Sequence, residues 1–296
     1  MISRAREREI QKLAREKLVA HDGMYLPVDP IKFAQTKLGI LVEPFVPNEP
    51  DVSGFLMQSG DKFGIGYSKS VASQGFQNFT VAHELGHYFI EGHCIALLAK
   101  GAHHSKSGYI SKDRHEREAD VFATEFLMPW KLIQPMVNGR EKGFAAVKSL
   151  SEQCESSLIA ASIRYAAVTQ ESVAVIVSNR GMVEFMTASE SFRQIHGIEW
   201  YKRGDILPPK VPSARLAANE SWIAECKICE EGARLSDWFS ESPSVEIEED
   251  IIGLGSYGRL LTILFSELRP KEEEMEQVTD DYIDRWKEGR FRKRGS

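Results

Sequence analysis

The sequence predicts an α+β fold, and three observations carry that expectation. Gly-rich, β-prone runs within residues 52–67 flank a Ser-Gly-Asp turn and indicate a hairpin. Residues 113–128 carry apolar side chains at i, i+3, i+4, i+7 and i+8, the pattern of an amphipathic helix. After Gln170, two short alternating runs around an Asn-Arg-Gly turn indicate strands again. We therefore expect both helices and sheets.

Other elements are expected on either side of these. Two N-terminal helices are predicted over residues 3–20 and 31–38, the second ended by Gly39. A further helix over about 77–91 precedes the polar segment 93–112, which is rich in Gly and Ser and is expected to be a loop. The remaining predictions are short helices over 144–154 and 158–167, strands over 173–177, 183–187 and 245–252, and a helix near 259–268.

The composition is that of an ordinary globular protein. The chain has 296 residues, of which 42% are hydrophobic, enough for a substantial core and more than one unit. Its net charge of −6 gives no support for general affinity to nucleic acid or anionic membrane. We find no run of about 18 apolar residues, which a membrane span needs, and no apolar secretory signal. Because four cysteines make no disulfide framework in so long a chain, we expect a cytoplasmic protein.

The segment FTVAHELGH contains H-E-x-x-H inside the helix predicted over 77–91. His83 and His87 are four residues apart, so they lie on one helix face about one turn apart. Both imidazoles can then reach one metal ion, and Glu84, beside that face, can take a proton from an attacking water. The alternative is coincidental spacing on an amphipathic helix. The hairpin before the motif and the acidic helix after it favour the metal site.

A third ligand is expected from the next predicted helix, which contains the segment HEREAD. Glu116 and Asp120 are four residues apart and adjoin its buried stripe. Glu116 can complete a His₂Glu site with the fourth position open, and Asp120 can accept the second N–H of a ligating histidine. Glu118 is the rival ligand, but it faces away from Glu116 on the same helix. A blander alternative makes both glutamates part of a solvated helix face.

The segments that carry these residues resemble the ImmA/IrrE family of metallopeptidases. VSGFLM, then FTVAHELGH, then EREADVFATEFLMP follow the order typical of that family, and the resemblance extends over about 25–135. It implies a zincin-like (gluzincin-like) metallopeptidase core with a Zn²⁺ ion held by His83, His87 and Glu116. It also implies that Glu84 is the catalytic glutamate. Another divalent ion such as Mn²⁺ is the alternative metal.

The resemblance implies a protein partner as well. Characterised members of the family cut or inactivate helix-turn-helix repressors. The expected substrate is therefore such a repressor, cleaved in a regulatory, stress or mobile-element switch. No direct contact with nucleic acid and no membrane partner is expected. The rival interpretation is a non-proteolytic regulatory protein that sequesters a repressor or senses a ligand.

The predicted organisation has four parts. A zinc metallopeptidase domain spans 1–135, and a helical segment that loosely resembles a helix-turn-helix spans 136–170. A small α/β unit, similar to the sensor-like unit of longer family members, spans 171–270, and a charged tail spans 271–296. The helical segment either contacts substrate or DNA or packs on the peptidase domain as a spacer. We favour the spacer, because residues 141–168 of this segment offer phosphates only Lys142, Lys148 and Arg164.

Several other patterns carry less weight. Cys226 and Cys229 form a lone C-x-x-C without the second pair that a zinc site needs. Residues 253–258 match G-x-G-x-x-G, but no βαβ unit accompanies them, so nucleotide binding is not expected. Extended substrate is expected to pair with the edge of the hairpin within 52–67. Candidates for stabilising an oxyanion, each otherwise an ordinary polar surface residue, are Tyr88, His93, His103, His104, Tyr109 and His115.

Overall fold

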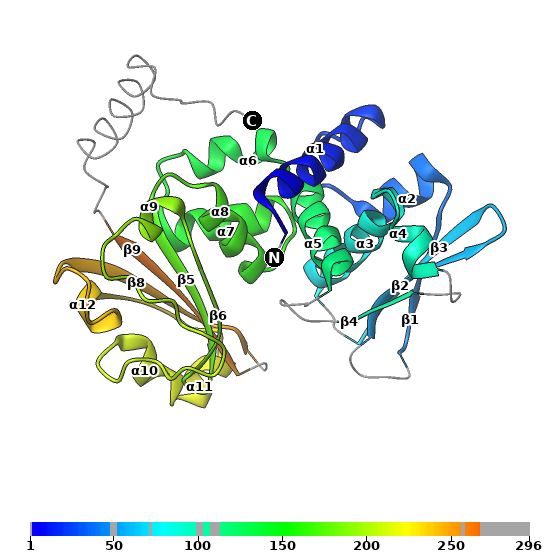
Figure 1. The fold of residues 1–296 in the computed structure, drawn as a ribbon. Helices are drawn as coiled ribbons and strands as arrows, with labels where there is room; N and C mark the ends of the chain where they lie inside the picture. The colour runs from blue at the N-terminus through cyan, green and yellow to red at the C-terminus, as the bar shows by residue number, and fades with distance from the viewer. Residues whose placement is uncertain are drawn as a thin grey trace, which may run out of the picture. The chain divides into compact units, whose positions relative to one another are not determined.

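The computed structural model describes residues 2–47, 52–70, 73–98, 103–106, 113–255 and 258–266. The chain divides into two compact units, Met1–Val168 and Thr169–Ser296. Each unit contains helices and a sheet (Figure 1), so the predicted α+β class is confirmed. The described helices include none that is both long enough and apolar enough to cross a membrane. The predicted charged tail lies outside the described residues, and the predicted four-part division stays a prediction.

The first unit contains a four-stranded sheet. Its strands are β1 (Leu41–Phe45), β2 (Val52–Ser59), β3 (Lys62–Ser68) and β4 (His103–Lys106). They lie in the order β1-β3-β2-β4, with β2 and β3 forming the predicted antiparallel hairpin. β1 pairs with β3 in parallel, and β4 pairs with β2. β4 therefore occupies the outer edge of the hairpin from Val52 to Leu56, and β1 occupies the other from Gly64 to Ser68. This pairing disfavours the expectation that substrate pairs with the hairpin itself.

The segment 93–112 is not simply the loop that its polar composition predicts. It contains α4 (His93–Leu98) and β4. β4 is held by its register with β2, from Val52 opposite Lys106 to Leu56 opposite His103. A short strand at the edge of a sheet is held by backbone hydrogen bonds, so it needs no alternation of apolar side chains. The alternation of apolar and polar side chains that predicts a strand is therefore missing from His103–Lys106.

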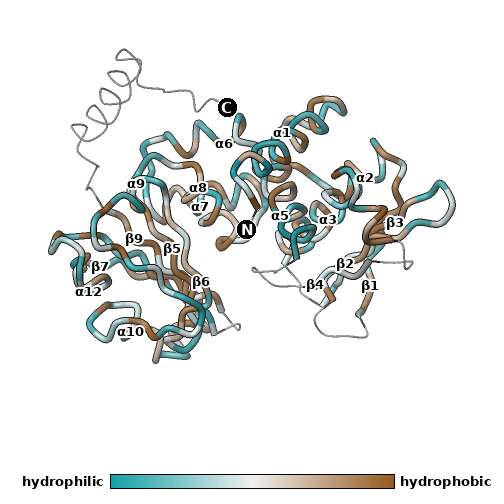
Figure 2. Tube along the Cα trace, in the orientation of Figure 1, coloured by the Kyte–Doolittle hydropathy of each residue, from teal (hydrophilic) through white to brown (hydrophobic). Residues whose placement is uncertain are grey.

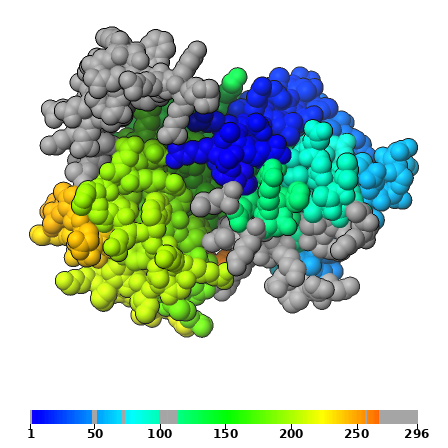
Figure 3. Space-filling view, viewed as in Figure 1, coloured from blue at the N-terminus to red at the C-terminus, as the bar shows by residue number. Residues whose placement is uncertain are grey.

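Helices α2, α3 and α4 pack against strands of this sheet, and the predicted helices of the first unit lie close to their predicted bounds. Like α4, α6 was not predicted; it begins directly after Pro129. The space-filling view shows residues of α1 (dark blue) lying over neighbouring residues of the same unit (Figure 3). The helices of the first unit other than α4 are α1 (Arg4–Ala20), α2 (Pro30–Leu38), α3 (Gln74–Phe89), α5 (Arg114–Leu127), α6 (Trp130–Val137), α7 (Gly143–Gln153) and α8 (Leu158–Val168).

Helix α1 packs on α5 through an apolar face and through ion pairs. Its buried residues Ile10, Ala14 and Leu18 are spaced four apart, which places them on one face. Arg15 Nη1 lies 2.8 Å from Oε1 of Glu125, a carboxylate of α5 that is 1% exposed. A buried charge of this kind is tolerated because it is paired. The N-terminal helix is thus part of the core of the first unit.

Helix α8 is also tied to α5 by a buried ion pair. Arg164 Nη2 lies 2.5 Å from Glu125 Oε2, and Arg164 Nε donates to the carbonyl oxygen of Met128 at 3.2 Å. Arg164 is 3% exposed, so this guanidinium is not available to phosphates. The contact supports the spacer interpretation of the helical segment over the interpretation as a DNA-binding element.

We expect Arg164→Met to destabilise the protein by about 3 kcal/mol, because removing one partner of a buried ion pair leaves the other charge buried. Glu125 keeps Arg15, which places the loss near the lower end of the usual range. Urea unfolding measures the difference. Lys148→Met is the matched control, since it removes an exposed i, i+4 pair with Glu152 at 3.9 Å and should shift stability by no more than about 0.5 kcal/mol. Equal losses in both variants would contradict the assignment.

The second unit contains a five-stranded sheet. Its strands are β5 (Ser172–Asn179), β6 (Met182–Ala188), β7 (Ile228–Arg234), β8 (Glu246–Gly253) and β9 (Arg259–Ser266). They lie in the order β6-β5-β9-β8-β7, and each neighbouring pair is antiparallel. The predicted α/β unit is therefore corrected, because parallel strands joined by helices define that class. Its described part is an antiparallel sheet with helices.

Strand β9 replaces the helix predicted near 259–268. The run RLLTILFS is almost wholly apolar, which fits either a buried helix or a strand buried on both faces. β9 lies between β5 and β8, and all its residues except Arg259 are buried. Gly253, Gly255 and Gly258 lie at the connection from β8 to β9, and a strand rather than a helix follows them. The glycine pattern therefore belongs to a turn.

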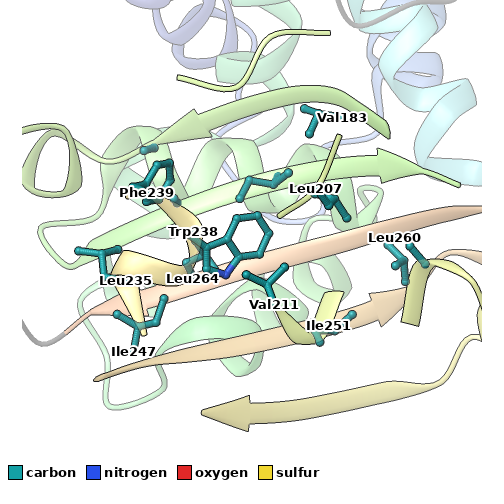
Figure 4. Packing of buried hydrophobic residues seen from close by; sticks show 14 of the residues in the cluster. Val183, Leu207, Val211, Leu235, Trp238, Phe239, Ile247, Ile251, Leu260 and Leu264 are labelled. Atoms are coloured by element: carbon teal, nitrogen blue, oxygen red, sulfur yellow. The ribbon is translucent and has the colours of Figure 1, made fainter. Parts of the chain in front are cut away.

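The core of the second unit lies between one face of this sheet and short helices. Figure 4 shows Trp238 beside Leu207, Val211 and Leu264, and Figure 2 shows apolar residues concentrated on the central strands β5 and β9. Burying these side chains is the main favourable contribution to folding here. The helices are α9 (Glu190–Arg193), α10 (Pro212–Ala217), α11 (Glu220–Ala224) and α12 (Leu235–Trp238).

Candidate metal centre

Helix α3 carries both histidines of the H-E-x-x-H motif on one face. The helix begins after Ser73, whose side chain accepts the backbone N–H of Phe76 at 3.4 Å. His83 and His87 are buried, with 6% and 0% of their surface exposed. Their Nε2 atoms lie 3.0 Å apart. Two imidazole nitrogens at this distance can both bind the same metal ion.

Helix α5 brings a carboxylate to the same point. Glu116 Oε2 lies 3.4 Å from Nε2 of His83, and its Oε1 lies 3.3 Å from Nε2 of His87. Ligand atoms of a tetrahedral zinc site with bonds of about 2.0–2.1 Å are about 3.3 Å apart. The three separations fit that geometry, and these residues form the group with metal-ligating potential found among the described residues. The donor set of two nitrogens and one carboxylate suits zinc.

Asp120 lies where it can orient His83. Its Oδ1 is 2.9 Å from Nδ1 of His83, which leaves the Nε2 of that ring facing Glu116. Although burial opposes a charged imidazole, hydrogen bonds to Asp120 and Glu116 raise the pKa of His83 to about 10. Two carboxylates thus attract positive charge to this point, and a cation held there would take the place of that proton.

Glu84 lies beneath strand β2 rather than in solvent. The residue is 0% exposed, and its carboxylate reaches the backbone of the sheet at Gly54. A Cβ added at Gly54 would lie 3.1 Å from Oε1 of Glu84 and would overlap the methyl group of Thr80. The glycine in VSGFLM therefore leaves the room that the glutamate occupies. This gives a physical reason for a Gly at that position of the strand.

Comparison with known proteins assigns the part of the chain that holds these residues. Residues 35–164 match the family described as the IrrE N-terminal-like domain, which is a family of peptidases. This part of the chain belongs to the ImmA/IrrE family. The ImmA/IrrE domain therefore runs from α2 to α8, and its peptidase class implies a protein as substrate. No curated protein matches the sequence.

A solved structure shares the fold over most of the chain. It is a Mycobacterium tuberculosis transcriptional regulator, with a TM-score of 0.53 and 12% sequence identity. The alignment covers 89% of this chain and 77% of that chain, so it extends beyond the ImmA/IrrE domain into the second unit. At this level of identity the likeness concerns the fold alone.

The rival ligand Glu118 is occupied elsewhere in the ImmA/IrrE domain. It is 1% exposed, so it does not belong to a solvated face. Arg6 Nη2 and Arg114 Nε each donate to its carboxylate at 2.7 Å. Burial alone would raise the pKa of Glu118, but the hydrogen bonds from Arg6, Arg114 and His93 lower this pKa to about 2. The carboxylate points to these cations, while Glu116 points to the histidines.

His93 is the residue of this centre whose place the sequence did not reveal. It was expected on the surface, but it is 2% exposed, and its Nδ1 lies 3.0 Å from Nδ1 of His87. Burial lowers the pKa of His93, partly offset by its hydrogen bond to Glu118. Its position six residues after His87 is the signal in the sequence that could have placed it against that ring. The turn at Gly92, with φ +86, brings it back against α3.

The other oxyanion candidates lie in different surroundings. Tyr88 packs its ring against Phe63 of β3, with centroids 5.0 Å apart. His115 lies beside His93, with ring centroids 4.8 Å apart. Tyr109 lies outside the described residues, and His103 and His104 belong to β4.

Gly86, between the two histidines, lets α3 and α5 approach closely. A Cβ at this position would lie 3.0 Å from Cα and 3.2 Å from the carbonyl oxygen of Ala119, and 3.2 Å from Cβ of Phe122. Because these neighbours are mostly backbone, they cannot move aside as a flexible side chain would. The glycine of HELGH therefore sets how near Glu116 comes to the histidines.

We expect Gly86→Ala to weaken metal binding and to destabilise the ImmA/IrrE domain by about 1–3 kcal/mol, the usual cost of overpacking. The loss of stability should appear even though the helix propensity of Ala is about 1 kcal/mol more favourable than that of Gly. Metal titration and thermal unfolding measure the two effects. Gly232→Ala is the matched control, since a Cβ at Gly232 meets nothing within 4 Å. Unchanged metal affinity in Gly86→Ala would contradict this role.

Proposed function

We propose that this protein is a zinc-dependent endopeptidase with a zincin-like core, and that it acts in the cytoplasm. His83, His87 and Glu116 hold the ion, Glu84 is the general base, and Asp120 orients His83. The observation that carries the proposal is the convergence of three ligand atoms at 3.0–3.4 Å in a domain of a peptidase family. Mn²⁺ is the alternative metal, since the same donors accept other divalent ions.

When bound, the ion polarises the substrate carbonyl and lowers the pKa of the attacking water. Glu84 takes a proton from that water at its carboxylate and passes it to the leaving amine. The buried position of Glu84 beneath β2 fixes the carboxylate, so little reorganisation is needed during the reaction. Asp120 keeps the Nδ1 proton of His83 hydrogen-bonded, which directs Nε2 to the ion.

The substrate strand pairs with β4 in this proposal, not with the hairpin. Among the described residues β4 pairs with β2 alone, and we place the substrate at its second edge. β4 lies next to the part of β2 that covers Glu84, with Ser105 opposite Gly54. An extended peptide added at this edge gains backbone hydrogen bonds, which give affinity with little dependence on sequence.

We further propose that the substrate is a helix-turn-helix repressor, cut at one or a few bonds. The substrate class rests on the family resemblance, and the solved structure of similar fold is itself named a transcriptional regulator. Limited cutting follows from edge pairing, because a folded protein offers extended residues only in linkers or in locally opened segments. The net charge of −6 also favours meeting the repressor off its DNA.

Co-expression with a helix-turn-helix repressor encoded beside the protein tests the substrate class. Wild type and Glu84→Gln are compared, and the repressor is then analysed by mass spectrometry. We expect a discrete pair of fragments with wild type and intact repressor with the variant. An intact repressor that co-purifies with both forms would support the non-proteolytic sequestering protein instead.

A further inference from the structure

A chain of hydrogen bonds runs from the proposed ligand His87 to the N-terminal helix. Nδ1 of His87 lies 3.0 Å from Nδ1 of His93. Nε2 of His93 lies 3.2 Å from Oε2 of Glu118, and Arg6 Nη2 donates to the same oxygen at 2.7 Å. His87, His93 and Glu118 are each at most 2% exposed, so water does not compete for these contacts.

The direction of each bond follows if Nε2 of His87 faces the ion. The proton of that ring is then on Nδ1, which donates to Nδ1 of His93. The proton of His93 is consequently on Nε2, which donates to the carboxylate of Glu118. The N–H groups of both histidines then meet an acceptor, and the chain ends on the guanidinium of Arg6. Only one pair of tautomers satisfies both histidines.

Glu118 is itself held from two sides. Arg114, one turn earlier on α5, donates to Oε1, while Arg6 of α1 donates to Oε2. Charge-assisted bonds of this length fix the carboxylate more firmly than neutral ones would. The acceptor that His93 faces is therefore rigid. Removing Arg6 leaves Oε2 with His93 and takes away the cation that holds this oxygen in place.

We propose that His93, Glu118 and Arg6 form a positioning chain that orients His87 for the metal, an inference that rests on the zinc site proposed above. Partners of this kind fix the tautomer and the orientation of a ligating ring and raise its basicity. Arg6 belongs to α1, which precedes the segment 35–164 matched by the ImmA/IrrE family. The metal site therefore depends on a helix that lies outside that segment.

The zinc affinity of His93 variants tests the first link. We expect His93→Phe to bind zinc about 10- to 100-fold more weakly than wild type, because the phenyl ring cannot accept from His87. His93→Gln offers an accepting oxygen and a donating N–H, so it should regain part of the loss. Competition with a chelator measures the affinity, and the absorption spectrum of the cobalt-loaded protein reports whether the ligand geometry has changed.

Arg6→Gln and Arg15→Gln test the link to α1 as a matched pair. Both arginines extend from α1 to a buried carboxylate of α5, at 2.7 Å and 2.8 Å, and both are about one-third exposed. Only the Arg6 contact continues to His93. We expect weaker zinc binding in Arg6→Gln and wild-type affinity in Arg15→Gln, with thermal unfolding as the measure of any general loosening of α1.

Each result decides between the proposals. Wild type that binds no zinc would reject the metal site, and with it the proposed function. Wild type that binds zinc, with unchanged affinity and cobalt spectrum in His93→Phe, would reject the positioning chain alone. If His93→Phe does not fold, the arginine pair decides. Equal losses in Arg6→Gln and Arg15→Gln would then attribute the effect to the packing of α1 and overturn the inference.

Discussion

Glu84→Gln is expected to lower the rate of peptide cleavage by about 10²–10⁴-fold, the usual contribution of a general base, while leaving the metal bound. The amide has nearly the shape of the carboxylate, so it fits beneath Gly54 without repacking. It cannot accept a proton from the attacking water. Cleavage of a peptide library, together with metal analysis of the purified variant, measures both parts of this prediction.

Glu91→Gln is the matched control for that experiment. Glu91 lies just beyond the end of α3 and is exposed, so the same change of charge there should leave the cleavage rate unaltered. Cleavage by Glu84→Gln at the wild-type rate would show that Glu84 is not the base. Loss of metal from Glu84→Gln would instead place Glu84 among the groups that hold the ion.

Glu116→Ala is expected to abolish stoichiometric zinc binding and, with it, cleavage. The substitution leaves two histidines as protein ligands, and a catalytic zinc site normally has three. Glu118→Gln is the informative comparison on the same helix. Since Glu118 points to Arg6 and Arg114, its loss should weaken zinc binding but still allow one ion per chain at saturating zinc.

Metal analysis at increasing zinc concentration separates these two glutamates. Full occupancy in Glu116→Ala would remove that residue from the proposed ligand set. If Glu118→Gln, and not Glu116→Ala, lost the ion, the third ligand would move to Glu118. Glu116 lies 3.3 and 3.4 Å from the two histidines. We therefore expect Glu116→Ala to lose the ion and Glu118→Gln to keep it.

The two helices of the metal centre were predictable because their information is local. The spacing of His83 and His87 by four residues places them on one face of any α-helix. Asp120 follows Glu116 by the same interval, and it meets His83 as the spacing suggested. Residues four apart share a face of an α-helix whatever the rest of the fold, so these shared faces could be predicted from spacing alone.

What could not be predicted depends on partners distant in the chain. Glu118 is buried because Arg6 reaches it from 112 positions earlier. β4 is a strand because β2 offers it an edge, and β9 is a strand because β5 and β8 lie on both sides of it. Neither short polar segments nor continuous apolar runs reveal such pairing, since their side chains do not alternate.

Zinc titration of the metal-free protein, followed by its cleavage of a peptide library, tests the central claim most directly. The account predicts no cleavage without metal and a rise that stops at one equivalent of zinc per chain. The ion is expected to be held by His83, His87 and Glu116, so Glu116→Ala should show no such rise. Full activity of the metal-free wild type would contradict the account.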